Sequence, residues 1–516
     1  MAATTSARPR RKNFPKAGKI LLIEPPNKLI VGFNATVVAE PLGLQYLAGN
    51  ILDLAEVMIY DMRVDTKPLS DVIREFQPDL VGIREGYTVD VDSVKNVASD
   101  VKKLIPDVPV IVGGHHVSLS PHDAYTFDID AIVIGDGEHP FRQLVLSLQK
   151  GEGLNKIVDV IFQDDDGNFD TSNLKNMKKS SLKELDSPMM NTRPFPARHL
   201  VERYRDKYFF LYHPNPYSVE TARGCIYRCN FCSVHEFHRG EYRVQGNDRT
   251  LKELSELPRN AWINIVDDLA IPEPPAALKL SHQNGYDPME ELADRLIELD
   301  LGQRYWMQVR ADNVVRNPKK FEKWARAGLD TTLVGLESFE QDDLNSVSKG
   351  TKVEDNEKAI DILHDVGVRI WGAVIVFQSW ADKNFENLKE KVYQKKIEFP
   401  NYTILTPLPG TGQWRELQHR LVTREPRFFD FLHSVLPTKL SHTKFYEQYA
   451  SLWRAVGDGG FDRVRKMLQE VTTTRESIMR FLRQYRTLSD VETYDKGIEL
   501  LEKANAKSAS EAKSNA

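Results

Sequence analysis

Residues 218–232 read Ser-Val-Glu-Thr-Ala-Arg-Gly-Cys-Ile-Tyr-Arg-Cys-Asn-Phe-Cys, a strand-like start followed by a loop with three cysteines. Cys225, Cys229 and Cys232 are all the cysteines of the 516-residue chain. Such bunching predicts a metal centre bound by thiolates. A [4Fe–4S] cluster normally takes four thiolates, so three leave one iron for another ligand. An open metal position marks catalytic rather than structural sites, so the loop predicts an enzyme.

Two alternatives compete with the cluster. His235 follows at a spacing that would complete a Cys3His zinc site. The cysteines would otherwise be inert core thiols, which their clustering disfavours. Small zinc modules are short folds that need the metal in order to fold. This loop lies inside a long α/β pattern with its own apolar core, which favours iron–sulfur.

The bulk composition excludes several classes of function. With 69 Lys and Arg against 74 Asp and Glu, the net charge is −5, which gives no general basic field for nucleic acid. No apolar run is long enough to span a bilayer. The basic N-terminus lacks the apolar stretch of a secretory signal. Cysteines confined to one loop fit a reducing compartment, so we expect a cytoplasmic protein.

The chain length predicts several domains rather than one core. Both ends have few apolar residues to bury and are expected to be disordered, and the basic lead would allow peripheral contact with an anionic membrane surface. The predicted division is a disordered lead (1–16), a first domain (17–150), a connector (151–205), a second domain (206–412), a helical C-terminal domain (413–503) and a disordered tail (504–516).

The first domain alternates apolar runs with helical segments such as Val91–Leu104. The runs are Ile20–Ile23, Val57–Tyr60, Leu80–Ile83, Val110–Val112 and Ala131–Ile134. This pattern predicts a doubly wound (Rossmann-like) α/β domain with a ligand at the carboxyl ends of its parallel strands. No G-x-G-x-x-G follows the first strand, which argues against a dinucleotide. Glycine pairs after two later strands suit a large flat ligand, although they are also consistent with simple turns.

Three motifs in this domain carry a resemblance to a known family. The segments 41–48 (PLGLQYLA), 113–121 (GGHHVSLSP) and 135–138 (GDGE) resemble the cobalamin-binding domain of cobalamin-dependent radical S-adenosylmethionine enzymes. The resemblance implies cobalamin contacts from Gly113, Gly114, His115, Ser118, Gly135, Gly137 and Glu138. The Asp-x-His-x-x-Gly signature for a lower histidine ligand is absent, which implies cobalamin bound without it.

A second alternation of strands and helices follows the connector. Its expected strands are Ser218–Ala222, Trp262–Val266, Tyr305–Val309, Thr332–Gly335, Ile370–Val376 and Thr403–Leu405, and its expected helices include Pro288–Leu299 and Lys319–Ala327. Six such units predict a partial (β/α)6 barrel whose active site lies at the carboxyl ends of the strands. The cysteine loop follows the first of these strands and therefore belongs to that edge.

The loop spacing Cys-x3-Cys-x2-Cys with Phe231 before the last cysteine resembles the radical S-adenosylmethionine superfamily, although Ile226 stands where many relatives have proline. The resemblance implies that S-adenosylmethionine chelates the open iron and is cleaved to a 5′-deoxyadenosyl radical. It also implies contacts to S-adenosylmethionine from residues at later strand ends. These candidates are Asp267, Asp268, Arg310, Gly335 and Glu337, with Asp312 beside them. Each acid has a structural alternative as a buried or capping carboxylate.

Beyond the loop 407–411 the pattern is helical, with aromatic residues at helical spacing over 428–436 and 445–453. They are expected to form a helical layer on the barrel, and a lid over an apolar substrate pocket is the other interpretation.

Together the domains resemble cobalamin-dependent radical methylases, in which cofactors carry the hard chemistry. The resemblance implies that one S-adenosylmethionine methylates reduced cobalamin and that a second supplies the radical that opens a substrate C–H bond. It also implies an electron donor such as a flavodoxin or ferredoxin. Within the group, the chain resembles hopanoid C-3 methylases, which implies an apolar triterpenoid substrate. The alternatives are a non-methylating tetrapyrrole cyclase and a non-enzymatic metal or cobalamin sensor.

Overall fold

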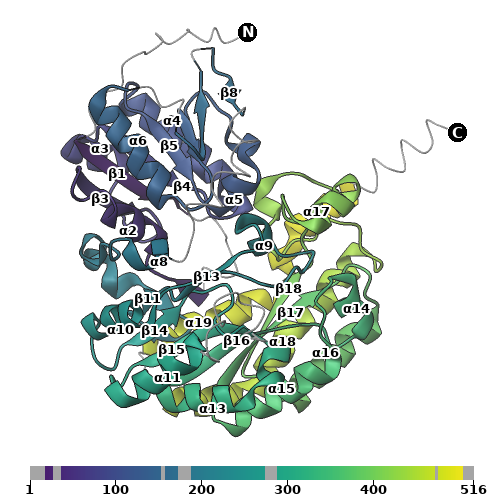
Figure 1. The fold of residues 1–516 in the computed structure, drawn as a ribbon. Helices are drawn as coiled ribbons and strands as arrows, with labels where there is room; N and C mark the ends of the chain where they lie inside the picture. Colours follow the sequence, from purple (N-terminus) through teal and green to yellow (C-terminus); the bar gives the residue numbers. More distant parts are fainter. Residues whose placement is uncertain are drawn as a thin grey trace, which may run out of the picture. The chain divides into compact units, whose positions relative to one another are not determined.

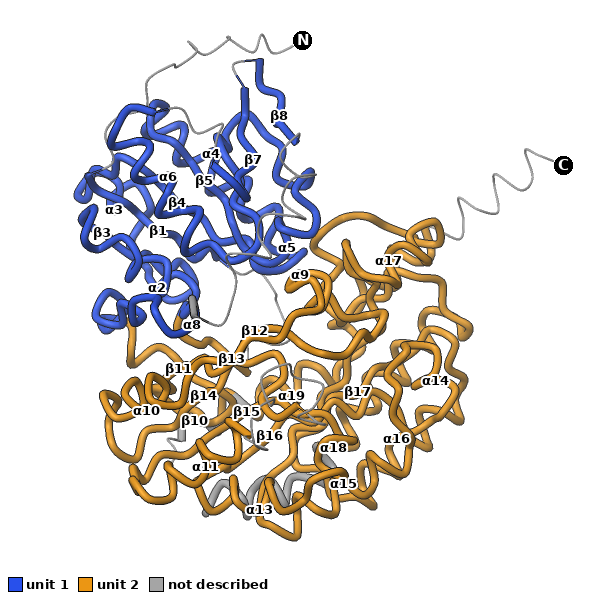
Figure 2. Tube along the Cα trace, in the orientation of Figure 1, with its two compact units in different colours: residues 1–27, 41–203 blue, residues 28–40, 204–516 orange. Residues whose placement is uncertain are grey.

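The computed structural model describes residues 18–26, 36–152, 157–164, 166–171, 188–272, 287–470 and 475–503. The predicted disordered ends, 1–16 and 504–516, lie outside these residues. Two compact units divide the chain, shown in blue and orange in Figure 2. Residues 1–27 and 41–203 make unit 1, and residues 28–40 and 204–516 make unit 2. These units divide the chain differently from the predicted domains, as described below.

Unit 1 is built on a seven-stranded sheet in the order β3-β1-β4-β5-β6-β7-β8. Its first five strands are parallel: β3 (Glu56–Asp61), β1 (Lys19–Glu24), β4 (Leu80–Arg84), β5 (Val110–Gly113) and β6 (Ala131–Val133). All five predicted apolar runs therefore form strands. Ile20–Ile23 are fully buried, as expected for a strand covered on both faces. The chain reverses its direction of winding at β1, so the switch point lies between β1 and β4.

Helices cover both faces of this sheet (Figure 1). The helices are α2 (Leu42–Gly49), α3 (Leu69–Phe76), α4 (Val91–Leu104), α5 (His115–Leu119) and α6 (Glu138–Lys150). Helix α4 has the predicted bounds and buries Val94, Val97 and Val101 in one core with α3. On the other face, Phe141 of α6 approaches Gly82 and Leu22 of the sheet. The doubly wound prediction is confirmed.

The predicted connector (151–205) contributes two strands to unit 1. β7 (Val160–Gln163) pairs antiparallel with β6, and β8 (Phe169–Asp170) pairs antiparallel with β7. A turn lies between them, where Asp164 Oδ1 accepts the N–H of Asn168 at 2.8 Å. Ile161 is fully buried in the core of the sheet. The strands β7 and β8 thus extend the sheet of unit 1, whereas the sequence prediction placed no strands between residues 151 and 205.

Unit 2 contains the predicted partial barrel, a six-stranded parallel sheet in sequence order (Figure 1). The strands are β11 (Tyr217–Val219), β14 (Trp262–Ile265), β15 (Arg304–Arg310), β16 (Leu329–Glu337), β17 (Arg369–Val376) and β18 (Phe399–Ile404). Each predicted strand overlaps one of these. The surrounding helices are α10 (Asn247–Glu256), α11 (Pro288–Leu299), α12 (Ala311–Arg316), α13 (Pro318–Ala327), α14 (Gln341–Ser346), α15 (Val353–Asp365) and α16 (Asp382–Gln394).

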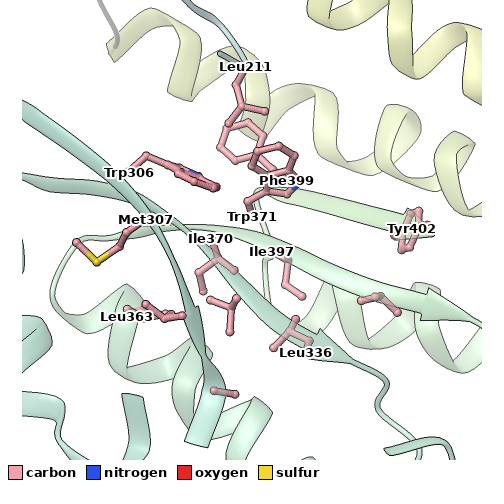
Figure 3. Close-up of a cluster of buried hydrophobic side chains, with 14 of the residues drawn as sticks. Leu211, Trp306, Met307, Leu336, Leu363, Ile370, Trp371, Ile397, Phe399 and Tyr402 are labelled. Carbon is pink, nitrogen blue, oxygen red and sulfur yellow. The ribbon is translucent and has the colours of Figure 1, made fainter. Parts of the chain in front are cut away.

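Aromatic side chains fill the amino-terminal end of the barrel. Phe210 lies with its ring 4.9, 4.7 and 5.6 Å from those of Trp262, Trp306 and Trp371. Each tryptophan stands near the start of its strand, and Figure 3 shows Trp306 and Trp371 together beside Leu211. Because this end is packed, chemistry is left to the carboxyl ends of the strands.

Phe210 reaches the barrel from a small antiparallel sheet. Its strands are β10 (His213–Pro214), β9 (Phe209–Phe210) and β2 (Val37–Val38). The pairing of β2 with β9 explains why residues 28–40 belong to unit 2 rather than to the predicted first domain. Glu40 is fully buried at its carboxylate and accepts hydrogen bonds from Arg205 and the Ser218 N–H at 2.8 and 2.6 Å.

The C-terminal helices α18 (His442–Glu470) and α19 (Arg475–Leu488) pack on the barrel instead of forming a separate domain. Tyr449 and Trp453 are buried in the same core as the strands, and the Tyr449 hydroxyl donates to the Tyr402 carbonyl at 2.8 Å. The predicted helical layer is therefore present, and these aromatics are used in packing. No helix within the described residues has the length and apolar character needed to cross a membrane.

The predicted helix over 428–436 is wrong. Only a 3-10 turn, η8 (Pro426–Phe428), forms there. Asp430 Oδ1 accepts the N–H groups of Leu432 and His433 at 2.9 Å, which offers the backbone an alternative to helical hydrogen bonds. Phe428, Phe429 and Val435 still share a small core, so the apolar spacing reflected burial without a helix.

Candidate functional site

A two-stranded hairpin closes the cysteine loop of unit 2. β12 (Ala222–Gly224) and β13 (Tyr242–Val244) pair antiparallel on either side of the loop, which includes α9 (Val234–Phe237). Gly224, directly before Cys225, has φ +94°, and a Cβ there would collide with the Glu241 carbonyl oxygen. Only glycine fits such a position, so the hairpin fixes where the first cysteine starts.

The acids after β14 hold the base of this loop. Asp267 is buried, and its Oδ1 accepts the Thr221 N–H at 2.7 Å while its Oδ2 accepts the Thr221 hydroxyl. Burial raises the pKa of Asp267 to about 7. Asp268 accepts the Gly224 N–H at 3.0 Å and lies 3.3 Å from His238 Nε2. Both oxygens of Asp267 are thus used within the protein, as expected for a buried structural carboxylate. Asp268, in contrast, is partly exposed next to Cys225.

The three thiols are free, with Cys229 buried and Cys225 and Cys232 partly buried. Burial raises the pKa of Cys225, and it raises the pKa of Cys232 to about 12, so without a cation these thiols stay protonated. A bound iron would supply the positive charge that a thiolate needs. The donor set of three soft sulfurs on one ordered loop therefore fits an iron–sulfur cluster.

A single zinc ion and an iron–sulfur cluster need different arrangements of the same thiols. Within the described residues, which include His235 and all three cysteines, no three His, Cys, Asp or Glu side chains converge as ligands of a single metal ion. A structural zinc needs such convergence at short distances. The thiolates of a cluster bind different irons, so their sulfurs do not have to meet at one point.

Arg310, the last residue of β15, lies against the cysteine loop. Its Nη1 lies 3.5 Å from Cys229 Sγ, and its guanidinium carbon lies 3.6 Å from the centre of the Tyr227 ring. Its Nε donates to Asp312 Oδ1 at 3.0 Å. The structure thus brings Arg310, Asp312 and the loop together at the carboxyl end of the barrel.

Strand β16 ends in an irregular, buried ion pair. The register of β16 against β17 shifts between Gly335 and Glu337, and Glu337 has φ +57°, a left-handed conformation that costs about 1–2 kcal/mol for a residue with a Cβ. Glu337 Oε1 lies 2.6 Å from Lys349 Nζ, and both residues are buried. A Cβ at Gly335 would lie 2.7 Å from each of these two atoms. Bulges and strained residues of this kind occur near active sites.

The candidate residues of unit 1 gather at the carboxyl edge of its sheet. Gly114 follows β5 with φ +138°, and a Cβ there would collide with the Glu85 carbonyl oxygen. Ser118 ties two glycine loops together, because its hydroxyl donates to the Gly114 carbonyl at 2.6 Å and accepts the Gly135 N–H at 2.9 Å. Gly135 has φ +75°, and a Cβ added to it would have no atom within 4 Å, so its Cα faces open space.

The other unit 1 candidates lie at the end of β5 or at the start of helices α5 and α6. Gly113 ends β5, and His115 begins α5. Gly137 precedes α6, whose first residue, Glu138, is buried and lies 3.5 Å from Arg193 Nη1. The strand ends thus bring all seven candidates to one edge of unit 1, as the parallel topology predicts.

Comparisons with known proteins match these two units to two families. Residues 28–145 match the B12 binding domain, and residues 219–392 match the Radical SAM superfamily. The chain belongs to the cobalamin-binding radical S-adenosylmethionine enzymes. The cofactors that accompany these two domains are a [4Fe–4S] cluster, S-adenosylmethionine and cobalamin.

The relatives of this radical enzyme include methylases and a cyclase. It is 27% identical to hopanoid C-3 methylase of Methylococcus capsulatus, over 79% of this chain and 74% of the relative. It is 24% identical to the anaerobic magnesium-protoporphyrin IX monomethyl ester cyclase of Rubrivivax gelatinosus, over 80% and 73%. A methylase and a cyclase are thus both similar to this chain over about four fifths of its length.

The fold is also that of a solved radical S-adenosylmethionine methyltransferase, TsrM from Kitasatospora setae, which was determined with cobalamin and a [4Fe–4S] cluster bound. The TM-score is 0.64 at 14% identity, with 95% of this chain and all of the other covered. At this identity the likeness establishes the fold of both domains.

Sequence reasoning on this radical enzyme missed a buried polar cluster in unit 1. Glu85 follows β4, its carboxylate is fully buried, and neither oxygen has a hydrogen-bond partner. His116 lies between Thr88 Oγ1 and Asp123 Oδ2, at 3.1 and 3.0 Å, and its Nε2 is 4.0 Å from Glu85. The available signal was a set of polar residues directly after two apolar strands. Lys349, which pairs with Glu337, gave no such signal.

Because the Glu85 carboxylate is buried without hydrogen-bond partners, we expect the stability of unit 1 to depend on pH. Burial raises the pKa of Glu85 from 4.5 to about 8. Between these values the folded state keeps a proton that the unfolded state releases, so stability falls as pH rises through this window. Glu85→Gln, which mimics the protonated form, is expected to match wild type at pH 5. At pH 8.5 it is expected to be more stable by about 4 kcal/mol, from 1.36 kcal/mol per pKa unit.

Thermal unfolding of the apoprotein at the two pH values measures this difference. Asp90, Asp123, Lys95 and His116, which surround Glu85, remain in both proteins and cancel in the comparison. Asp100→Asn, which removes an exposed carboxylate from α4, is the control. Its difference in stability from wild type should be the same at both pH values. An advantage of Glu85→Gln that is equal at pH 5 and pH 8.5 would contradict a protonated Glu85.

Proposed function

We propose that the enzyme transfers a methyl group to an unactivated carbon of a large apolar substrate, with C-3 of a hopanoid as the specific candidate. The observation that carries the proposal is the presence of a B12 binding domain and a radical domain in one chain that is similar to a hopanoid C-3 methylase over 79% of its length. When bound, cobalamin and the cluster with S-adenosylmethionine supply the methyl group and the hydrogen-abstracting radical.

The chain's own residues have binding and positioning roles in this proposal. Cys225, Cys229 and Cys232 hold the cluster and leave one iron for S-adenosylmethionine. Asp268, Gly335 and Glu337 are proposed to contact S-adenosylmethionine, because they lie at strand ends on the same edge as the loop. Asp267, whose two oxygens are used by Thr221, is assigned the structural role.

The proposed cobalamin contacts come from the edge of unit 1. The glycines at 113, 114, 135 and 137 let backbone approach a flat ring closely, because they carry no Cβ. Ser118 keeps two of these loops at a fixed separation. His115 and Glu138 complete the set at the first turns of their helices. Holding both loops rigid before the ligand arrives lowers the entropy cost of binding.

Apolar side chains after the last barrel strand support an apolar substrate. Leu408 and Trp414 follow β18 and pack, partly buried, on the small core of Phe428 and Phe429. They lie on the carboxyl-end side of the strand, where barrel active sites form. An electron donor such as a flavodoxin or ferredoxin is part of the proposal, as are a cytoplasmic location and peripheral contact with the membrane that holds the substrate.

The proposal is tested with anaerobically reconstituted protein, a reductant, cobalamin, methyl-deuterated S-adenosylmethionine and a desmethyl hopanoid. We expect 5′-deoxyadenosine and a hopanoid that carries the deuterated methyl group, both read by mass spectrometry. 5′-Deoxyadenosine without labelled hopanoid, from protein loaded with both cofactors, would contradict the hopanoid substrate.

A second candidate is radical chemistry without methyl transfer, which the similarity to the Rubrivivax gelatinosus cyclase favours. The same assay separates the two when a magnesium-porphyrin monomethyl ester replaces the hopanoid. A product without deuterium and with a mass change from ring formation would favour the cyclase reaction. A deuterated product from either substrate would favour methyl transfer.

A further inference from the structure

The guanidinium of Arg310 is bound on every nitrogen by protein atoms. Nε donates to Asp312 Oδ1 at 3.0 Å, Nη1 to Cys229 Sγ at 3.5 Å, and Nη2 to the Lys349 carbonyl at 2.7 Å. The residue is 6% exposed. These contacts link the end of β15, the second cysteine and the β16–β17 connection at one point. Because all three guanidinium nitrogens bind protein atoms, Arg310 stabilises the surrounding segments and has no nitrogen left without a protein contact.

One face of Arg310 also anchors the part of the loop between the first two cysteines. The Tyr227 ring covers the guanidinium at 3.6 Å, well within the range of a cation–π contact. The Tyr227 hydroxyl donates to Asn313 Oδ1 at 2.5 Å, and Asn313 Nδ2 donates to the Ile271 carbonyl at 2.8 Å. Tyr227 is therefore fixed at both its ring and its hydroxyl.

The segment after Cys229 is held from the other side. The Asn230 N–H donates to the Val347 carbonyl at 3.2 Å, and its Nδ2 donates to the Ser346 carbonyl at 3.1 Å. The Gln413 N–H donates to the Asn230 carbonyl at 2.9 Å. The turn 346–349 therefore contacts both Arg310 and Asn230, so Cys229 lies between two fixed points.

We propose that Arg310 is a positioning residue for the cluster. It fixes the backbone on both sides of Cys229, and it places a permanent positive charge at the Cys229 sulfur. Arginine stays charged at every relevant pH, and a hydrogen bond or charge at a cluster sulfur favours the reduced state, which is the more negative one. This role replaces the direct contact with S-adenosylmethionine that the sequence resemblance implied. It rests on the cluster and not on the proposed substrate.

Two substitutions separate the charge from the geometry. Arg310→Gln removes both, whereas Arg310→Lys keeps the charge but cannot reproduce three donors in a planar fork. Arg316→Gln is the matched control. Arg316 lies 3.1 Å from Asp312 and 3.3 Å from the Tyr227 hydroxyl, but it is 47% exposed, so its charge is screened by solvent.

The readouts are iron and sulfide per reconstituted chain, resistance of the iron to a chelator, and the midpoint potential of the cluster from a redox titration followed by electron paramagnetic resonance. For Arg310→Gln we expect iron loss about 10–100-fold faster than in wild type, the range for outer partners of a metal site, and a more negative midpoint potential. Arg310→Lys should lose iron faster but keep most of the wild-type potential. Arg316→Gln should match wild type in both measurements.

Wild-type potential and iron retention in Arg310→Gln would overturn the proposal. An equal negative shift in Arg310→Lys and Arg310→Gln would overturn the electrostatic role. If Arg310→Gln does not fold, as judged by circular dichroism, Arg310→Lys decides the geometric role: iron retention like that of wild type would refute it. None of these readouts needs a substrate, so they are independent of the methyl-transfer proposal. A wild-type chain that binds no iron would instead contradict the cluster itself.

Discussion

Cys229→Ser is expected to abolish cleavage of S-adenosylmethionine. Cys229 is the one cysteine of the three whose residue as a whole is buried, and it is in contact with Arg310, so its sulfur lies between two fixed segments of the loop. Loss of a partner outside the first ligand sphere costs about 10–100-fold in metal affinity or activity, and loss of a direct ligand should exceed this. We therefore expect formation of 5′-deoxyadenosine to fall more than about 100-fold, together with loss of iron.

The measurement compares iron content and 5′-deoxyadenosine formation with those of Arg228→Ala. Arg228 lies in the same loop, between the first two cysteines, but its side chain is exposed. That control should keep both iron and activity. Serine is close in size to cysteine, so the fold of the variant should be preserved, and unchanged circular dichroism checks this. Cleavage at the wild-type rate in Cys229→Ser would refute the cluster ligand set.

Gly114→Ala is expected to destabilise unit 1 and to remove cobalamin binding. Gly114 has φ +138° and ψ −174°, a region open essentially only to glycine, and a Cβ would collide with the Glu85 carbonyl oxygen. Backbone strain of this kind costs about 1–3 kcal/mol, and the collision with a main-chain atom adds to it. Because Glu85 N–H donates to the Gly113 carbonyl, the neighbouring loops have little room to move apart.

Two other glycine variants separate folding from ligand approach. Gly151 is a left-handed glycine at the end of α6, and a Cβ added to it would have no atom within 4 Å. The free energy of unfolding of Gly151→Ala should therefore fall by about 1 kcal/mol, and the variant should still bind cobalamin. Gly135→Ala has equal space but belongs to the proposed ligand edge, so it should fold and bind cobalamin poorly. Cobalamin titration and thermal unfolding measure both effects. Tight binding by Gly135→Ala would contradict the proposed close approach of the ring.

Strands and their edge could be predicted from the sequence because buried parallel strands are continuous apolar runs. Both sheets follow those runs, and parallel topology alone brought the cysteine loop and the glycine loops to strand ends. The helix over 428–436 was wrong because burial spacing does not reveal that Asp430 would cap the local backbone. Strand β7 was missed because it pairs antiparallel with β6 at the end of the sheet, after the last unit of the parallel pattern on which the prediction was based.

The types of residue in the candidate site and their place at strand ends could be predicted from the sequence, but the contacts between them could not. The three cysteines and Glu337 lie where strand order placed them. The role assigned to Arg310 depends on its contact with Cys229. The two residues are 81 positions apart in the chain, so no local sequence pattern reveals this contact. Glu85 was overlooked for the same reason, since its burial comes from how the loops after β4 and β5 close over it.

The radical chemistry of this enzyme depends most on a cluster with one open iron. The most direct test is metal analysis of anaerobically reconstituted wild-type protein, with electron paramagnetic resonance of the reduced state before and after addition of S-adenosylmethionine. We predict about four irons per chain and a signal that changes when S-adenosylmethionine binds the open iron. Zinc retained in place of iron, or an iron signal that S-adenosylmethionine leaves unchanged, would contradict a cluster with an open iron.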